Sequence, residues 1–300
     1  MKKTKIALFA LTAMLASCSS DDGERTDGRL PRRLTIAGVP MTRATLTEGD
    51  GSSLGAAWEA GDAATYFNVS SFKSDVMDCG TLMATGPGRT SAFSGTVCCS
   101  AGDAVALFYP QQEMATTGAY RGGFTLSLGG QKGTLTDIAR RYHYVYGVAK
   151  VTSVTGGTAH ATISNMEPLL SVCRFAFVDK ASDADAPRTI AVKSLAIEFF
   201  DHDSGSAIGY PQYATLSPTQ ATGTPALKYA GQEAWEPLSV TLDAETDGGV
   251  YVALFPYSPT GYMRFTVTNS SGTYTGTAKA TLEAGGYYNV RLKVGSINSR

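Results

Sequence analysis

The chain has few charged side chains and few histidines for its length. Of its 300 residues, 17% are charged, whereas soluble proteins commonly have about 25%. Its 25 Lys and Arg residues are matched by 26 Asp and Glu residues, so binding to nucleic acid through phosphate neutralisation is not expected. Three histidines leave little material for imidazole catalysis or a zinc site. The composition therefore favours an extracellular β protein over an enzyme.

Long helical patterns are also missing. No window longer than about ten residues has a convincing apolar stripe, and only residues 167–172 are compatible with one helical turn. Apolar residues instead recur with a period of two, which is typical of strands. The clearest alternation places Tyr288, Val290, Leu292 and Val294 on one face. Because glycine and aspartate cluster between such runs, as turns require, the sequence predicts an all-β protein.

The N-terminus has the features of a bacterial lipoprotein signal. Three lysines precede an apolar stretch at residues 6–16, which is too short to span a bilayer as a helix and indicates a signal peptide. The following Leu15-Ala16-Ser17-Cys18 resembles the lipobox. This resemblance implies cleavage by signal peptidase II between Ser17 and Cys18 and acylation of the Cys18 thiol. Two or more acyl chains would hold the protein stably on a membrane.

An acidic stretch at residues 19–24 follows the lipobox cysteine. It resembles the tag that directs lipoproteins of the Bacteroidota to the outer face of the outer membrane, although a solvated polar tether has the same composition. Removal of residues 1–17 takes away three of 25 basic residues and none of 26 acidic ones, so the net charge becomes 22 − 26 = −4. We expect a surface-exposed lipoprotein of the cell outer membrane.

Four cysteines remain after lipidation: Cys79, Cys98, Cys99 and Cys173. Adjacent cysteines on a strand point to opposite faces, so Cys98 and Cys99 are not expected to bridge each other. The sequence has no C-x-x-C pair or histidine spacing for zinc. We expect buried free thiols, with a disulfide from Cys79 to Cys98 or Cys99 as the alternative in a compartment that permits it.

Similar strand patterns in the two halves of the chain predict two tandem β-sandwiches, with chance similarity of short apolar strands as the alternative. Residues 93–97, 105–110 and 124–126 correspond to residues 238–242, 252–257 and 265–267. The boundary is predicted near Pro168, although residues 179–187 are also linker-like. The predicted organisation is a signal peptide at 1–17, a lipidated tether with a removable first strand at 18–43, an N-terminal sandwich at 44–168 and a C-terminal sandwich at 169–300.

Several motifs occur in an order that resembles the fimbrillin family, the Mfa-like and FimA-like pilins and adhesins of Bacteroidales. They are Met41-Thr42-Arg43-Ala44-Thr45, Trp58-Glu59-Ala60-Gly61-Asp62, Phe108-Tyr109-Pro110 and Leu282-Glu283-Ala284-Gly285-Gly286-Tyr287-Tyr288. With the lipobox they span nearly the whole chain. The resemblance implies two tandem transthyretin-like β-sandwiches, in agreement with the internal repeat.

The resemblance also implies assembly by strand exchange. An Arg-specific protease cuts a loop after the first strand, and a strand from another subunit fills the groove that the released strand leaves. Here the leaving strand is predicted at residues 34–39, with Leu34, Ile36 and Val39 as its apolar residues.

The predicted cleavage site is the bond between Arg43 and Ala44, after Pro40. A solvated loop arginine is the equally weighted alternative. Arg29, Arg32 and Arg33 precede the predicted strand, so cleavage there would remove only the tether.

One departure from the family concerns the donor segment that stalk-forming members carry at the C-terminus. Here residues 295–300 alone follow Val294. Either the strand with Tyr288, Val290, Leu292 and Val294 is the donor, or the subunit accepts a strand and donates none, as suits a tip or minor subunit. In a third alternative, the protein never polymerises.

No catalytic, metal or cofactor motif stands out. Asp201-His202-Asp203 is the nearest candidate, but strand alternation separates its imidazole from its carboxylates, and a polar turn is expected. Trp58 and Trp235 are candidates for stacking on sugars, although core packing is the commoner use of indole. The alternative to a fimbrial subunit is therefore a glycan-binding surface lipoprotein, with a secreted hydrolase third. Expected partners are fimbrial subunits or a second copy, the outer membrane, and a host protein or glycan receptor.

Overall fold

The computed structural model describes residues 28–40, 45–48, 54–73, 76–112, 124–218, 227–229, 233–257, 261–279 and 281–297. Apart from helix α1 (Leu135–Asp137) and the adjoining π-helical turn η1 (Ile138–Tyr142), its regular structure consists of strands, which confirms the all-β prediction. Within this described part, no helix is long and apolar enough to span a membrane. Residues 167–172, which the sequence leaves compatible with a helical turn, form no helix: they contain β11 (Glu167–Pro168) and the start of β12 (Ser171–Asp179).

The first eight-stranded sheet closes on itself. Its order is β10-β1-β6-β5-β4-β7-β9-β11, and β10 also pairs with β9, so β1 lies between β6 and β10 in a closed ring. The interior of this ring holds an apolar core that includes Leu34, Ile36, Trp58 and Phe93. The strands not yet given are β1 (Leu30–Pro40), β4 (Ala63–Lys73), β5 (Val76–Ala84), β6 (Thr90–Cys99), β7 (Ala104–Tyr109), β9 (Val145–Thr155) and β10 (Thr158–Ile163).

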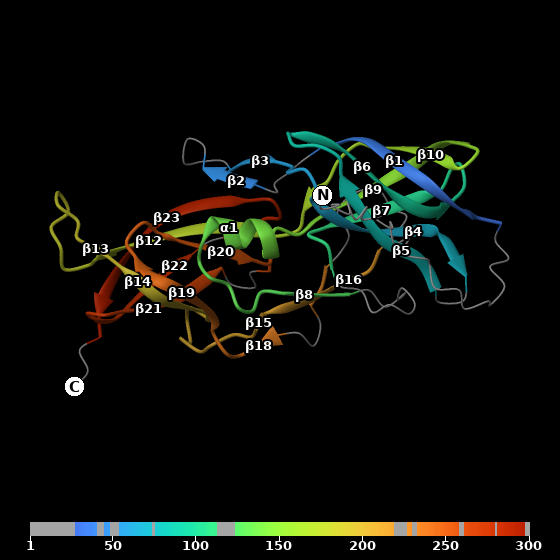
Figure 1. Ribbon diagram of the computed structural model, residues 1–300. Coiled ribbons are helices and arrows are strands. Elements are labelled where there is room, and N and C mark those ends of the chain that lie inside the picture. Colours follow the sequence, from blue (N-terminus) through green and yellow to red (C-terminus); the bar gives the residue numbers. More distant parts are fainter. Residues whose placement is uncertain are drawn as a thin grey trace, which may run out of the picture.

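The second eight-stranded sheet has the order β13-β12-β23-β22-β21-β14-β19, and β20 pairs with β12. Figure 1 shows it beside the first sheet, at the end of the molecule where the chain finishes. Its strands alternate buried and exposed residues, as in Leu238–Thr246. They are β12, β13 (Thr189–Ile190), β14 (Val192–Phe199), β19 (Leu238–Thr246), β20 (Val250–Leu254), β21 (Tyr262–Asn269), β22 (Gly272–Lys279) and β23 (Tyr287–Ser296).

The two sheets share one pairing scheme, but the strand correspondence predicted from the sequence is wrong. The first strand of each sheet has an antiparallel neighbour on one edge and a parallel neighbour on the other: β1 has β6 and β10, and β12 has β20 and β23. The short strand β13 also pairs antiparallel with β12. By pairing, β6 therefore corresponds to β20 and β7 to β21. The sequence comparison had matched β6 with β19 and β7 with β20, one strand too early, because short apolar strands resemble one another.

The third predicted correspondence, 124–126 with 265–267, is wrong because β8 (Phe124–Ser127) lies outside the first sheet. It joins β16 (Tyr213–Leu216) and β17 (Leu227–Lys228) in a small sheet between the two large ones (Figure 1). Phe124 packs edge-to-face on Phe108, with ring centroids 4.7 Å apart. The remaining strands are β2 (Thr45–Glu48), β3 (Leu54–Ala57), β15 (Tyr210–Pro211) and β18 (Glu233–Ala234).

A single apolar core joins the two halves of the chain. It contains Phe108 and Tyr146 of the first sheet and Phe175 and Phe265 of the second, together with residues of β8, β16 and η1. Aromatic side chains bury large apolar areas and contribute strongly to such contacts. The chain crosses from the first sheet, where β11 pairs with β9, to the second at β12; the domain boundary near Pro168 stays a prediction.

Candidate strand-exchange site

Strand β1 is paired along both edges. It forms an antiparallel ladder with β6 from Leu30 opposite Cys99 to Pro40 opposite Thr90, and a parallel ladder with β10 from Arg33 to Ala37. Because β1 starts at Leu30, the expectation that Arg32 and Arg33 precede the strand is wrong. Both arginines are paired within β1. Their side chains are at least partly exposed, so a search for apolar residues does not assign them to the strand.

The three apolar residues that were predicted to carry the exchange all face the ring interior. Leu34, Ile36 and Val39 are fully buried. Strict alternation would place Ile36 and Val39 on opposite faces, because they are three residues apart. The ladder register shifts between them, and Gly38 has a φ of +64°. This β-bulge, with glycine in the left-handed conformation, turns both side chains inward.

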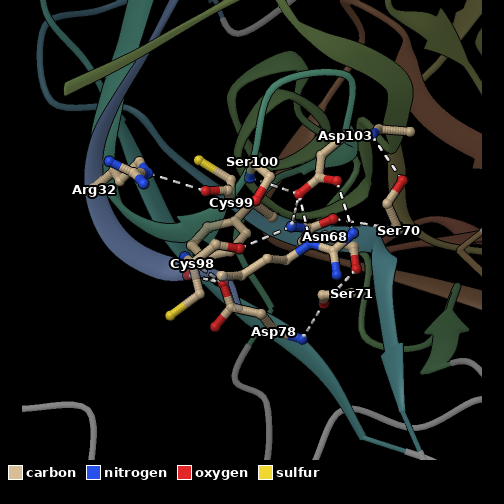
Figure 2. Close-up of polar contacts among 12 residues, drawn as sticks. Arg32, Asn68, Ser70, Ser71, Asp78, Cys98, Cys99, Ser100 and Asp103 are labelled. Carbon is tan, nitrogen blue, oxygen red and sulfur yellow. Dashed lines mark hydrogen bonds and ion pairs between the residues drawn. The ribbon is translucent and has the colours of Figure 1, made fainter. Parts of the chain in front are cut away.

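A buried polar cluster holds the start of β1 (Figure 2). The Asp103 carboxylate accepts hydrogen bonds from Arg29 Nε at 2.7 Å and Nη2 at 2.8 Å, from Asn68 Nδ2 at 3.0 Å and from the Ser100 amide at 2.9 Å. Burial alone would raise the pKa of Asp103, but these donors outweigh it and lower the pKa below its usual value. We call Arg29, Asn68, Ser100 and Asp103 the Asp103 cluster; it ties β1 to β4 and to the turn before β7.

Trp58 holds the other end of β1. Its indole Nε1 donates to the Val39 carbonyl at 3.1 Å, and its ring packs edge-to-face on Phe93 and Tyr109 at centroid distances of 4.7 and 5.2 Å. Trp58 is buried, which confirms a structural role and removes it as a sugar-stacking candidate. Trp235 is 69% exposed, so it remains a candidate for stacking on sugars.

The candidate donor strand β23 is engaged in its own sheet. It pairs in parallel with β12 from Val172 opposite Tyr287 to Asp179 opposite Val294, and it meets β22 at Tyr274 and Thr275. Among its predicted exchange residues, Leu292 and Val294 are buried, and Tyr288 and Val290 are partly buried. The strand therefore serves the second sheet in the role that β10 has in the first.

The predicted processing residues lie outside the described part of the chain. Ser17 and Cys18 precede residue 28, and Arg43 and Ala44 fall in sequence between the end of β1 at Pro40 and the start of β2 at Thr45. Lipidation of Cys18 and both cleavages therefore stay predictions.

The remaining candidates from the sequence are four cysteines and the Asp201-His202-Asp203 stretch. Cys79, Cys98, Cys99 and Cys173 are free thiols, and burial raises the pKa of Cys99 to about 11 and of Cys173 to about 12. The Asp201 carboxylate accepts hydrogen bonds from the amide and hydroxyl of Ser204, both at 2.8 Å, as expected for a polar turn. No group of three or more metal-ligating side chains occurs among the residues that the structure describes.

The fold of the chain is similar to that of solved structures from Bacteroides. A "putative cell adhesion protein" from Bacteroides ovatus shares 13% identity at a TM-score of 0.51, with coverage of 90% of this chain and 96% of that one. A second, from Bacteroides uniformis, shares 16% identity at a TM-score of 0.51, covering 91% and 97%. The chain has the fold of these two proteins. The architecture expected from the fimbrillin resemblance is thereby confirmed.

A further structural match is the tip fimbrial protein Mfa3 from Porphyromonas gingivalis with C-terminal truncation, at 9% identity and a TM-score of 0.41, covering 90% of this chain and 97% of that one. No family model matches the chain, and no curated protein does.

Proposed function

We propose that this protein is a non-enzymatic fimbrial subunit or surface adhesin. It is exported as a lipoprotein, anchored in the outer membrane through Cys18, and joined to other subunits or to copies of itself by protease-triggered strand exchange. The observation that carries the proposal is the place of β1, a strand near the N-terminus that closes the first ring between β6 and β10. The fold shared with two Bacteroides proteins described as adhesion proteins supports it.

Removal of β1 would create an acceptor for another strand. Its ladder with β6 has nine paired positions and its ladder with β10 has five, so both neighbours would present unpaired backbone groups. The sites of Leu34, Ile36 and Val39, all fully buried, would become apolar pockets. A groove with open edges and regularly spaced pockets is suited to β-strand addition.

The pairing of β23 with β12 favours a subunit that accepts a strand from another subunit. Its eight-residue ladder with β12 would have to break before this strand could enter another subunit. We therefore propose that the subunit accepts a strand in place of β1, as subunits of a type V-like fimbrium do, and that donation of β23 to another copy needs this ladder to open as well. A copy whose ladder stays closed would end the fibre, as a tip or minor subunit would.

The test is to treat the purified precursor with an Arg-specific protease and run it unboiled in SDS. We expect a ladder of SDS-resistant oligomers that boiling dissociates, built from subunits that begin at Ala44. The control variant Arg43→Ala should keep its β1 and stay monomeric. Protein that is cut at Arg43 and yet forms no ladder would contradict the assembly mechanism.

The anchor is tested separately by mass spectrometry. The wild-type chain should carry acyl groups on Cys18, and Cys18→Ala should be soluble and unacylated. Lipid retained by that variant would refute the anchor assignment.

A glycan-binding lipoprotein that does not polymerise is the second candidate, favoured by the exposure of Trp235. Exposed indole rings can stack on sugars. A glycan array that shows binding by the uncut monomer and its loss in Trp235→Ala would support this function. No binding above that of the variant would remove it.

A further inference from the structure

The second sheet has a gap that its own strands do not close. In the first sheet β5 and β6 pair directly, at Met83 with Ser94 and at Ala84 with Phe93. The corresponding strands β19 and β20 have no ladder with each other; β19 pairs with β14, and β20 pairs with β12. Each therefore has a second edge that needs another partner.

That partner is a piece of the first half of the chain. We call residues 128–133, which connect β8 to α1, the inserted segment. Gln131 forms a parallel bridge with Val240 of β19, and its carbonyl accepts the Thr241 amide at 3.2 Å. On the opposite side, the Gly133 carbonyl accepts the amide of Tyr251 in β20 at 3.0 Å.

The Gln131 side chain replaces a further pair of ladder bonds. Its Oε1 accepts the Ala253 amide at 2.8 Å, and its Nε2 donates to the Ala253 carbonyl at 3.0 Å and to the Leu128 carbonyl at 3.1 Å. Gln131 is buried. The buried side-chain amide of Gln131 donates and accepts a hydrogen bond with β20, as a backbone peptide unit would. Loss of this amide would leave the buried backbone groups of Ala253 unpaired, which is costly.

Gly133 fits between the two strands only because it lacks a side chain. A Cβ atom there would lie 2.8 Å from Val250 Cγ1 and 3.0 Å from Leu242 Cδ1, so both strands close on this glycine. Its φ of +71° also favours glycine.

Two tyrosines that follow the inserted segment in sequence hold it in place through hydrogen bonds. Tyr142 donates from its hydroxyl to the Gly129 carbonyl at 2.7 Å, and Tyr144 donates to the carbonyl of Ser127, just before the segment, at 2.9 Å. The chain makes this excursion between β7 and β9, whereas the corresponding strands β21 and β22 of the second sheet join in a tight turn at Asn269 and Gly272. The excursion is therefore an addition to the first repeat.

We propose that the inserted segment is an intramolecular donor that completes the second sandwich. It occupies the facing edges of β19 and β20, so that no strand from another molecule can pair there, and strand acceptance is confined to the first sandwich. The closure of these edges follows from contacts within the chain and is independent of cleavage at Arg43, whereas the confinement of strand acceptance to the first sheet rests on the proposed function.

The test uses the full chain and hydrogen–deuterium exchange of single amides by NMR. In Gln131→Ala we expect the Ala253 amide to exchange at least tenfold faster than in the wild type, and the Thr241 and Tyr251 amides to follow. The amides of β1 should be unchanged. The matched control is Gln111→Ala, which removes an exposed glutamine whose Nε2 donates to Thr81 Oγ1 at 2.8 Å; the three amides should keep their wild-type protection.

A second variant tests the open edges directly. Gly133→Val should expel the segment, and a synthetic peptide of residues 124–134 added in excess should restore protection at Thr241 and Tyr251. Two results would overturn the proposal: exchange within twofold of wild type at all three amides in Gln131→Ala, or an equal rise in the β1 amides, which would indicate global destabilisation instead. Because Gln131→Ala leaves the main chain of the inserted segment unchanged, it decides the question even if Gly133→Val does not fold.

Discussion

Replacement of Asp103 by asparagine should weaken the first sandwich by removing the carboxylate that holds the start of β1. The Asp103 and Arg29 side chains are 6% and 18% exposed, so the variant would lose a largely buried ion pair. Breaking a buried pair costs about 3–5 kcal/mol. Because an asparagine oxygen can still accept one hydrogen bond, we expect a loss of about 2–3 kcal/mol in the free energy of unfolding.

Urea unfolding at pH 7 measures this loss, with the emission of the buried Trp58 as a reporter of the first sandwich. The control is Glu198→Gln in the second sandwich, whose ion pair with Arg264 is 25% and 37% exposed and should be worth less than about 1 kcal/mol. An Asp103→Asn loss no larger than that of the control would refute the role of the Asp103 cluster.

The difference in the free energy of unfolding between wild type and Asp103→Asn should depend on pH. Hydrogen bonds from Arg29 and Asn68 outweigh burial and lower the pKa of Asp103 in the folded protein. Its contribution is therefore fully present above the unfolded-state pKa of about 3.9 and is lost as the pH falls through the lower folded value. The stabilities of wild type and Asp103→Asn should converge below about pH 4, and a constant difference across this range would contradict the assignment.

Three further predictions concern the core around β1 and the thiols. Ile36→Ala should cost about 2–5 kcal/mol in urea unfolding, because it empties a fully buried site in the ring; a cost below about 1 kcal/mol would place this side chain outside the core. Trp58→Phe removes the donor to the Val39 carbonyl and should speed amide exchange at the end of β1, with no change in the second sheet as its control. Cys99 and Cys173 should resist alkylation by iodoacetamide at pH 8 in the native protein, because both thiols are buried with raised pKa values; rapid modification seen by mass spectrometry would contradict their burial.

The alternation of apolar residues and the clusters of turn residues are sufficient to predict the fold class. Leu34, Ile36 and Val39 are all buried in the ring, and the bulge at Gly38 that turns them to one face is visible only in the ladder register. The arginines at the start of β1 were missed because a strand whose outer face meets water need not be apolar there.

The sequence alone predicts neither which strands of the two sheets correspond nor the role of the inserted segment. Short apolar strands fit several alignments equally well, and only pairing identifies β6 with β20. Gln131 and Gly133 have the local composition of an ordinary turn, and their role depends on contacts with residues more than a hundred positions away. The helical region at residues 135–142 cannot be predicted from periodicity, because α1 and η1 together are too short to show an apolar stripe.

The most direct test of the account is whether a free β1 strand competes with assembly. The precursor is cut with an Arg-specific protease, the protease is inhibited, and an isotope-labelled peptide of residues 30–40 is added in excess before native mass spectrometry. The account predicts one peptide bound per cut subunit and the loss of oligomers, because the peptide fills the groove between β6 and β10. Oligomers that form undiminished without bound peptide would contradict the claim that this groove is where subunits join.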